Sequence, residues 1–307
     1  MVVRSGKKNE KPLLHPYAFD ATKSSSSSTN GEGGNLLSYE MIKVDVRAGI
    51  GFLTWSRPRV HNAISPEMMA ETMDALSALG VRDDVRVIIL SGEGKSFSSG
   101  CDISVRADRE TQGIDEWRTR YQKSLQFMLS FWRCPKPIIA SIHGYCLAGG
   151  FEASLACDIS VAAESARFGM PEAKMGSPSI LLMLPWLAGP KMSKEILMCA
   201  EDTFSAARAK EAGIVNHVVP DEERESFVLE LANHIVGASP VAVSYFKRAI
   251  NQTFEIMGLM PALEANGAAA ASRKGIVDKD RDEFLSIRKE QGLKAAIAWR
   301  ASRVGAQ

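Results

Sequence analysis

Short, nearly continuous apolar runs that alternate with helical segments constrain the fold of this chain most strongly. The runs lie at 85–91, 137–143 and 159–163. Such runs are typical of strands that are buried on both faces of a sheet. Helical spacing of apolar residues predicts a helix at Met68–Leu79, before the first of these strands, and another at Ile114–Arg133, between the first and the second. The alternation predicts an α/β fold that is built from repeated units.

The chain around the first helix follows the same pattern. Met41–Val46 alternates apolar and polar residues as a half-buried strand does, and Ile50–Trp55 is predicted as a second strand. Ser65 is a natural N-cap and Pro66 suits the first helical position, so a helix is expected to begin there. From about Glu222 the pattern predicts only helices, at 223–236, 240–254, 262–271 and 278–287.

Three parts are therefore expected along the chain. Residues 1–38 combine lysines, a serine run and glycines with few apolar residues, which predicts a flexible extension. A transit peptide is disfavoured for this part, because it lacks an arginine-rich amphipathic helix and contains Glu10 and Asp20. Residues 39–221 are predicted to form the α/β core, and residues 222–307 a helical domain.

Composition narrows the classes of function. The net charge of +1 arises from 37 basic and 36 acidic residues, which gives no general field for nucleic acid or an anionic membrane. The longest apolar stretch, at 180–187, is too short to span a membrane and contains Pro185. Five scattered cysteines without a C-x-x-C pair predict a reducing, cytoplasmic location and no metal site.

Two glycine-rich turns directly follow predicted buried strands. They are GEGKSFSSGCDI at 92–103 and GYCLAGGFE at 144–152. Neither matches a P-loop or a dinucleotide-binding motif, and the chain has no G-x-S-x-G elbow for serine hydrolysis. Glycine allows backbone N–H groups to approach a ligand closely, and a helix that begins in the second turn adds its positive end. Such donors can stabilise a developing oxyanion.

Two glutamates stand out beside these turns. Glu152 lies in the first turn of the helix that follows Gly149-Gly150, and Glu172 follows Pro171. Considered alone, a glutamate in a first helical turn is usually a dipole partner, and one after proline is usually solvated. Spacing by itself therefore favours a structural role for both.

Longer sequence blocks change that interpretation. They are Arg57-Pro58 with Asn62-Ala63, SFSSGCDI at 96–103, IASIHGYCLAGGFEASLACDI at 139–159 and ARFGMPEAKMG at 166–176. In these blocks, and from about Met41 to the C-terminus, the sequence resembles the crotonase (enoyl-CoA hydratase/isomerase) superfamily. The resemblance implies a crotonase-like spiral of ββα units with a helical C-terminal trimerisation domain, assembled as a homotrimer or a dimer of trimers.

The resemblance also implies an active site. The backbone N–H groups of Cys101, where alanine is usual, and of Gly149 would form an oxyanion hole for a thioester carbonyl. Glu152 and Glu172 would hold and activate water. The residues that it implies for binding the substrate and its coenzyme A moiety are Arg57, Arg59, Val60, Ser99, Asp102, Ile103 and Lys247. Solvent-facing roles remain open for Arg57, Arg59 and Lys247. No cofactor beyond the coenzyme A of the substrate is implied.

Both glutamates together favour enoyl-CoA hydratase activity, the syn addition of water to an enoyl-CoA thioester. Isomerisation, decarboxylation and C–C hydrolysis of an acyl-CoA remain alternatives within the superfamily. A non-catalytic RNA-associated role is disfavoured by the near-zero net charge. Residues 176–186 carry larger apolar side chains where typical hydratases have glycines, so the acyl site is expected to differ in size and shape.

Overall fold

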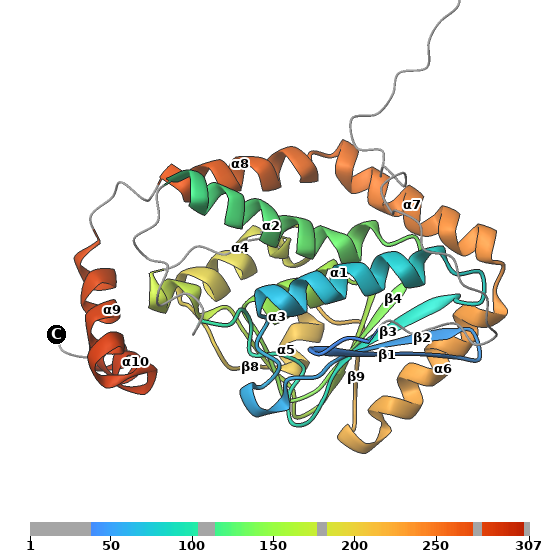
Figure 1. Cartoon of the computed structure of the whole chain (residues 1–307), viewed down its shortest axis with the longest axis horizontal. Helices are drawn as coiled ribbons and strands as arrows, with labels where there is room; N and C mark the ends of the chain where they lie inside the picture. The colour runs from blue at the N-terminus through green and yellow to red at the C-terminus, as the bar shows by residue number, and fades with distance from the viewer. Residues whose placement is uncertain (1–37, 104–113, 177–182, 273–277, 304–307) are drawn as a thin grey trace, which may run out of the picture. The chain divides into compact units, whose positions relative to one another are not determined.

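The computed structural model describes residues 38–103, 114–176, 183–272 and 278–303. These residues belong to one compact unit, Leu37–Gln307 (Figure 1). The predicted flexible extension lies, up to residue 37, outside the described residues. The domain boundary after residue 221 stays a prediction.

A six-stranded sheet forms the centre of this unit. Its strands, in spatial order, are β1 (Ile42–Arg47), β2 (Ile50–Trp55), β3 (Val87–Gly92), β4 (Ile138–Ile142), β6 (Ile159–Ala163) and β9 (His217–Val219). Only β1 and β2 pair antiparallel, and all other neighbours are parallel. Ala48 and Gly49 join β1 to β2 with φ angles of 50° and 82°, the left-handed conformations that a tight type I′ hairpin requires. The predicted α/β class is confirmed.

A second, small sheet was not predicted. It contains β5 (Tyr145–Leu147), β7 (Arg167–Gly169) and β8 (Phe204–Ser205), in which β5 and β7 are parallel. The sequence pattern indicates no strand at 167–169, where the chain forms β7, which is followed by the 3-10 helix η3 (Pro171–Met175). Strands of two or three residues are too short to show a periodicity.

Helices surround the sheet and make up all the described elements after β9. Their bounds are α1 (Pro66–Val81), α2 (Ile114–Arg133), α3 (Gly149–Ala156), α4 (Leu184–Met198), α5 (Ala206–Glu211), α6 (Arg224–Gly237), α7 (Pro240–Ile256), α8 (Leu259–Ser272), α9 (Lys279–Gln291) and α10 (Leu293–Ser302), with short 3-10 helices η1 (Pro58–Val60) and η4 (Asp221–Glu223). Ser65 caps α1 as predicted, since its side chain accepts a hydrogen bond from the Met68 N–H.

In the described part of the chain no single helix is long and apolar enough to cross a membrane. The pair Asp221–Gly237 and Pro240–Ile256 meets that criterion only when taken together and is bent by 108°.

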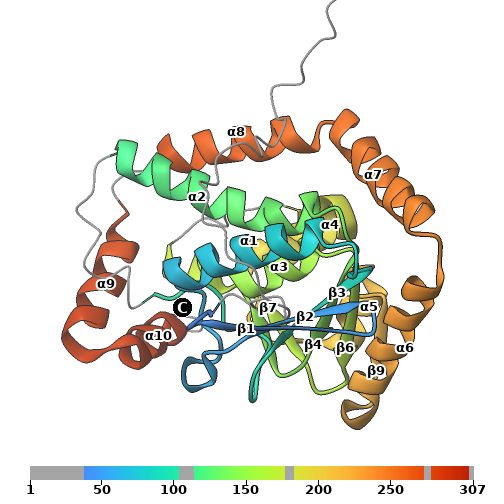
Figure 2. The same cartoon turned by 45° about the vertical axis from the view of Figure 1, so that its right-hand side comes forward.

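The six-stranded sheet is buried on both faces, which explains its continuous apolar runs. In β3, Ile88 and Leu90 belong to the large core that also contains apolar side chains of α1 and α2. Val87 and Ile89 point to the opposite face and pack in a second cluster with apolar side chains of α6. Figures 1 and 2 show α1 and α2 on one side of the sheet and α6 on the other.

Lys247 of α7, a predicted contact of coenzyme A, has several partners within the chain. Its Nζ donates to Asp158 Oδ2 at 2.7 Å and to the carbonyl oxygens of Lys136 at 3.1 Å and Phe131 at 3.4 Å. The lysine side chain is only 8% exposed. All three ammonium protons have acceptors within the chain. Lys247 thereby anchors α7 to the core.

Replacing Lys247 by methionine should therefore destabilise the fold. The substitution leaves the Asp158 carboxylate, whose side chain is 21% exposed, without its cation. We expect a loss of about 2 kcal/mol of unfolding free energy, below the range for a fully buried pair because water still reaches the carboxylate. Urea unfolding measures the loss. The exposed neighbour Arg248 provides the control Arg248→Met, and equal stability of the two variants would contradict an anchoring role.

Candidate active site

The two glycine-rich loops lie directly against each other. Ser98 N–H donates to the Tyr145 carbonyl at 2.9 Å, and Leu147 N–H donates to the Ser98 carbonyl at 3.0 Å. A Cβ atom on Gly100, whose φ is +94°, would lie 2.6 Å from Ala148 Cβ. A Cβ atom on Gly149 would lie 2.8 Å from Cys101 Sγ and 3.3 Å from Cys101 N. Only glycine at these two positions allows so close an approach.

This approach brings Cys101 and Gly149 together. Gly149 is the first residue of α3, and the first N–H groups of a helix have no acceptor within the helix. They also carry the positive end of the helix dipole. The preceding residue, Ala148, adopts φ 49° and ψ −123°, an unusual conformation for a residue with a Cβ, and its N–H donates to the Gly169 carbonyl at 2.8 Å. The arrangement suits an anionic oxygen.

The two glutamates follow neighbouring parallel strands. In the small sheet, Leu147 at the end of β5 is paired with Gly169 at the end of β7. Glu152 lies in the first turn of α3, which follows β5, and Glu172 lies in the first turn of η3, which follows β7. The carboxyl ends of paired parallel strands are about 5 Å apart, so both glutamates lie at the same edge of this sheet. Glu152 is 1% exposed and Glu172 is partly buried.

Helix α2 covers this edge with side chains that the sequence analysis did not identify. A Cβ atom on Gly149 would lie 3.5 Å from Met128 Cε. Tyr121 is buried two helical turns before Met128, and its hydroxyl donates to the Leu263 carbonyl at 3.0 Å. Burial, together with the nearby Glu152 carboxylate, raises the pKa of Tyr121 to about 12. The seven-residue spacing of Tyr121 and Met128 is a usable sequence signal for one helix face.

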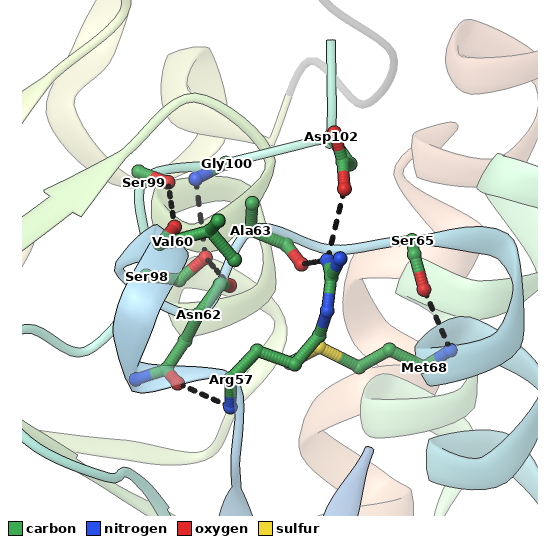
Figure 3. Close-up of polar contacts among 10 residues, drawn as sticks. All are labelled: Arg57, Val60, Asn62, Ala63, Ser65, Met68, Ser98, Ser99, Gly100 and Asp102. Atoms are coloured by element: carbon green, nitrogen blue, oxygen red, sulfur yellow. Dashed lines mark hydrogen bonds and ion pairs between the residues drawn. The ribbon is translucent and has the colours of Figure 1, made fainter. Parts of the chain in front are cut away.

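Asn62 also helps to build the site, through hydrogen bonds that the Asn62-Ala63 sequence block does not reveal. It is fully buried with φ 53°, a left-handed conformation that asparagine tolerates. Its Oδ1 accepts from Arg57 N–H at 2.9 Å, and its Nδ2 donates to the carbonyls of Glu93 and Ser96 at 2.9 and 2.7 Å. Its own carbonyl accepts from Ser98 Oγ at 2.9 Å (Figure 3). One side chain thus joins the segment before α1 to the first glycine-rich loop.

Arg57 and Asp102, both predicted to contact coenzyme A, contact each other. Arg57 Nη1 lies 3.0 Å from Asp102 Oδ2 and also donates to the Ala63 carbonyl (Figure 3). The two side chains are 22% and 10% exposed. This ion pair ties the chain after Cys101 to the segment that contains Asn62.

The other predicted contacts surround the same loop, except for Lys247. Ser99 Oγ donates to the Val60 carbonyl at 3.2 Å, and the side chains of Arg59 and Val60 are exposed. The Ile103 carbonyl accepts from Arg288 of α9. Of the atypical segment 176–186, residues 177–182 lie outside the described residues.

The remaining polar groups give no indication of a metal site. The described ranges contain no group of three or more His, Cys, Asp or Glu side chains arranged to hold a metal ion. His61 Nδ1 lies 3.0 Å from Ser96 Oγ, and His143 Nε2 lies 2.8 Å from the Gly94 carbonyl. Both histidines therefore have loop partners.

Comparisons with known proteins identify the family of this chain. The Enoyl-CoA hydratase/isomerase family matches residues 45–284. A crotonyl-CoA hydratase of Syntrophomonas wolfei is 33% identical over 220 residues, which cover 70% of this chain and 83% of that protein. The chain belongs to the enoyl-CoA hydratase/isomerase family, the crotonase superfamily.

Solved structures share the fold. The crystal structure of an enoyl-CoA hydratase/isomerase from Xanthobacter autotrophicus Py2 is 38% identical, with a TM-score of 0.84, and the match covers 87% of this chain and 99% of that one. A probable enoyl-CoA hydratase from Mycobacterium thermoresistibile is 31% identical, with a TM-score of 0.70, and the match covers 76% and 95% of the two chains.

A methyl group on Gly149 should block the site. In Gly149→Ala the new Cβ would lie 2.8 Å from Cys101 Sγ and 3.3 Å from Cys101 N, against the backbone of the facing loop. We expect kcat with an acyl-CoA substrate to fall about 100- to 1,000-fold, the usual effect of losing one preorganised backbone donor in an active site. Steady-state kinetics on folded protein measure the change. The control is Gly237→Ala, where a Cβ meets nothing within 4 Å. An equal loss of kcat in both variants would contradict the place of Gly149 in the active site.

Proposed function

We propose that this protein is an enoyl-CoA hydratase that adds water in the syn sense across the α,β double bond of an enoyl-CoA thioester. The observation that carries the proposal is the placement of Glu152 and Glu172 after the paired strands β5 and β7, beside the backbone of Cys101 and Gly149. The name of the 33% identical relative, crotonyl-CoA hydratase, supports the same chemistry.

The proposed reaction begins with the thioester carbonyl between the N–H groups of Cys101 and Gly149. These donors stabilise the negative charge that develops on the oxygen. Glu152, as a carboxylate, removes a proton from water while the water oxygen bonds to the β-carbon. Glu172, as a carboxylic acid, donates its proton to the α-carbon of the resulting enolate. One water molecule is added in total, and the proton held by Glu152 returns to Glu172 through solvent before the next turnover.

The local environment supports this division of roles. Glu152 lies in the first turn of α3, where the helix dipole stabilises a carboxylate. Met128 of α2 lies beside Gly149 and, with Tyr121 buried on the same helix, limits the access of competing water to this edge. Two close carboxyl groups titrate as a pair, so the acid and base roles describe the pair in its reactive protonation state.

Binding of the coenzyme A moiety is proposed for the loop around Val60 and Ser99. Arg59 and Val60 are exposed there and can contact the nucleotide. Arg57 and Asp102 hold the loop through their ion pair. Coenzyme A enters as part of the substrate, and no separate cofactor or metal is proposed.

The proposed assembly is a homotrimer or a dimer of trimers. Helix α7 presents a row of large apolar side chains to solvent, Val241, Tyr245, Phe246 and Ile250, each more than half exposed. Exposed apolar surface of this extent is typical of a protein interface.

All five cysteines are free thiols, which supports the proposed cytoplasmic location.

Removing either carboxyl group should abolish most of the activity. In Glu152→Gln and Glu172→Gln the side chain keeps its size but loses the ability to exchange a proton. We expect kcat for crotonyl-CoA to fall about 100- to 10,000-fold in each, the usual contribution of a general acid or base. Spectrophotometric loss of the conjugated double bond measures hydration.

The control for both variants is Glu164→Gln, which changes an exposed glutamate outside the predicted site. It should retain wild-type kcat. Near-wild-type hydration by either Glu152→Gln or Glu172→Gln would contradict the proposed mechanism.

A further inference from the structure

We infer that helix α9 holds two parts of the active site in place, the chain after Cys101 and the 3-10 helix η3 that contains Glu172. Arg288 is the positioning residue for the chain after Cys101. This inference rests on the proposed function. Arg288 Nη2 donates to the carbonyl of Ile103, 185 positions earlier in the sequence. Ile103 is two residues after Cys101, whose N–H is one of the two proposed oxyanion donors. The guanidinium is itself only partly exposed.

The same helix contacts the other half of the site. Gly176 ends η3, the short helix that contains Glu172, and adopts φ +63°. A Cβ atom on Gly176 would lie 2.9, 3.0 and 3.1 Å from Cβ, Cγ and Cδ of Arg281. The Arg281 side chain therefore lies along the backbone at the end of η3. Arg281 and Arg288 are seven residues apart, so they lie on one face of α9, two turns from each other.

Helix α9 is itself fixed in place by packing and hydrogen bonds. Phe284 lies on the same face, between the two arginines, and is 1% exposed. Asp278 caps the helix by accepting from Arg281 N–H at 3.0 Å. α10 packs beside α9 (Figure 2), where Arg300 donates to the Asp280 carbonyl at 2.8 Å and Arg303 Nη1 lies 2.6 Å from Asp280 Oδ1.

The physical consequence concerns the oxyanion donor. A charged donor on the Ile103 carbonyl fixes the direction of the peptide chain just beyond Cys101. Backbone donors stabilise an oxyanion only when they are held in place before the reaction, and an error of about 1 Å costs about 100-fold in rate. Arg288 therefore acts through the Cys101 N–H. The ion pair between Arg57 and Asp102 restrains the same loop through a contact with the segment before α1.

The test compares Arg288→Met, Arg288→Lys and the control Lys289→Met, which changes the adjacent, exposed cation of α9. Three experiments are carried out: steady-state kinetics with crotonyl-CoA, which give kcat and KM, the red shift in absorbance of bound hexadienoyl-CoA, and amide hydrogen exchange of residues 98–103. The red shift reports polarisation of the thioester carbonyl, and the exchange rate reports the order of the loop without any substrate.

We expect Arg288→Met to lower kcat about 10- to 100-fold with a smaller change in KM, since a misplaced donor weakens transition-state stabilisation more than binding. Its red shift should shrink and exchange at 98–103 should accelerate. Arg288→Lys, which keeps a cationic donor, should recover part of all three, and Lys289→Met should match wild type.

A wild-type red shift and wild-type exchange in Arg288→Met would overturn the inference. If Arg288→Met does not fold, Arg288→Lys is tested with the same measurements. A smaller red shift and faster exchange at 98–103 than in wild type support the positioning role, and wild-type values of both overturn it. Failure of the proposed function is separable, because wild-type protein would then neither hydrate crotonyl-CoA nor shift hexadienoyl-CoA, while hydrogen exchange would still test the contact between Arg288 and Ile103.

Discussion

The close backbone approach at Gly100 and Gly149 is the contact on which the rest of the site depends. A side chain at either position would meet backbone or Cβ atoms at 2.6 to 3.3 Å, so the two loops could not pack in this way. The approach lets the loop after β3 pair with β5, and β5 in turn pairs with β7. Through these pairings one steric condition sets the relative positions of Cys101, Gly149, Glu152 and Glu172.

Polar contacts keep this packed arrangement in one conformation. Asn62, buried within the loop, satisfies backbone groups that a loop at this depth would otherwise leave without partners. The ion pair of Arg57 with Asp102 and the bond from Arg288 to Ile103 restrain the chain beyond Cys101 from two sides. Rigid support of this kind is what preorganised electrostatic catalysis requires.

The longest and most buried elements could be predicted from the sequence. The predicted bounds of α2, at 114–133, and of β6, at 159–163, are those of the structure, because a long amphipathic helix and a doubly buried strand both have strong patterns. β5 and β7 could not be predicted, since strands of three residues have no detectable period. Yet their pairing is what brings Glu152 and Glu172 to one edge, so spacing alone could not relate the two glutamates.

Contacts across long sequence separations limited the prediction of individual roles. Lys247 had the character of a solvated or phosphate-binding residue, but its partner Asp158 is 89 positions away and occupies its ammonium. Arg288 and Asn62 had no separate chemical signature, since their partners are backbone carbonyl and amide groups. The Arg57-Pro58 and Asn62-Ala63 block did locate the Asn62 region through family resemblance, although it did not reveal the hydrogen bonds.

The most direct test of the central claim is the fate of isotope-labelled water. Wild-type protein is incubated with crotonyl-CoA in water that carries both heavy oxygen and deuterium, and the product is analysed by mass spectrometry and NMR. We expect 3-hydroxybutyryl-CoA with one heavy oxygen at C3 and one deuterium at C2, added to the same face. Recovery of unhydrated acyl-CoA, or of a product whose double bond has only moved, would contradict the proposed hydratase function.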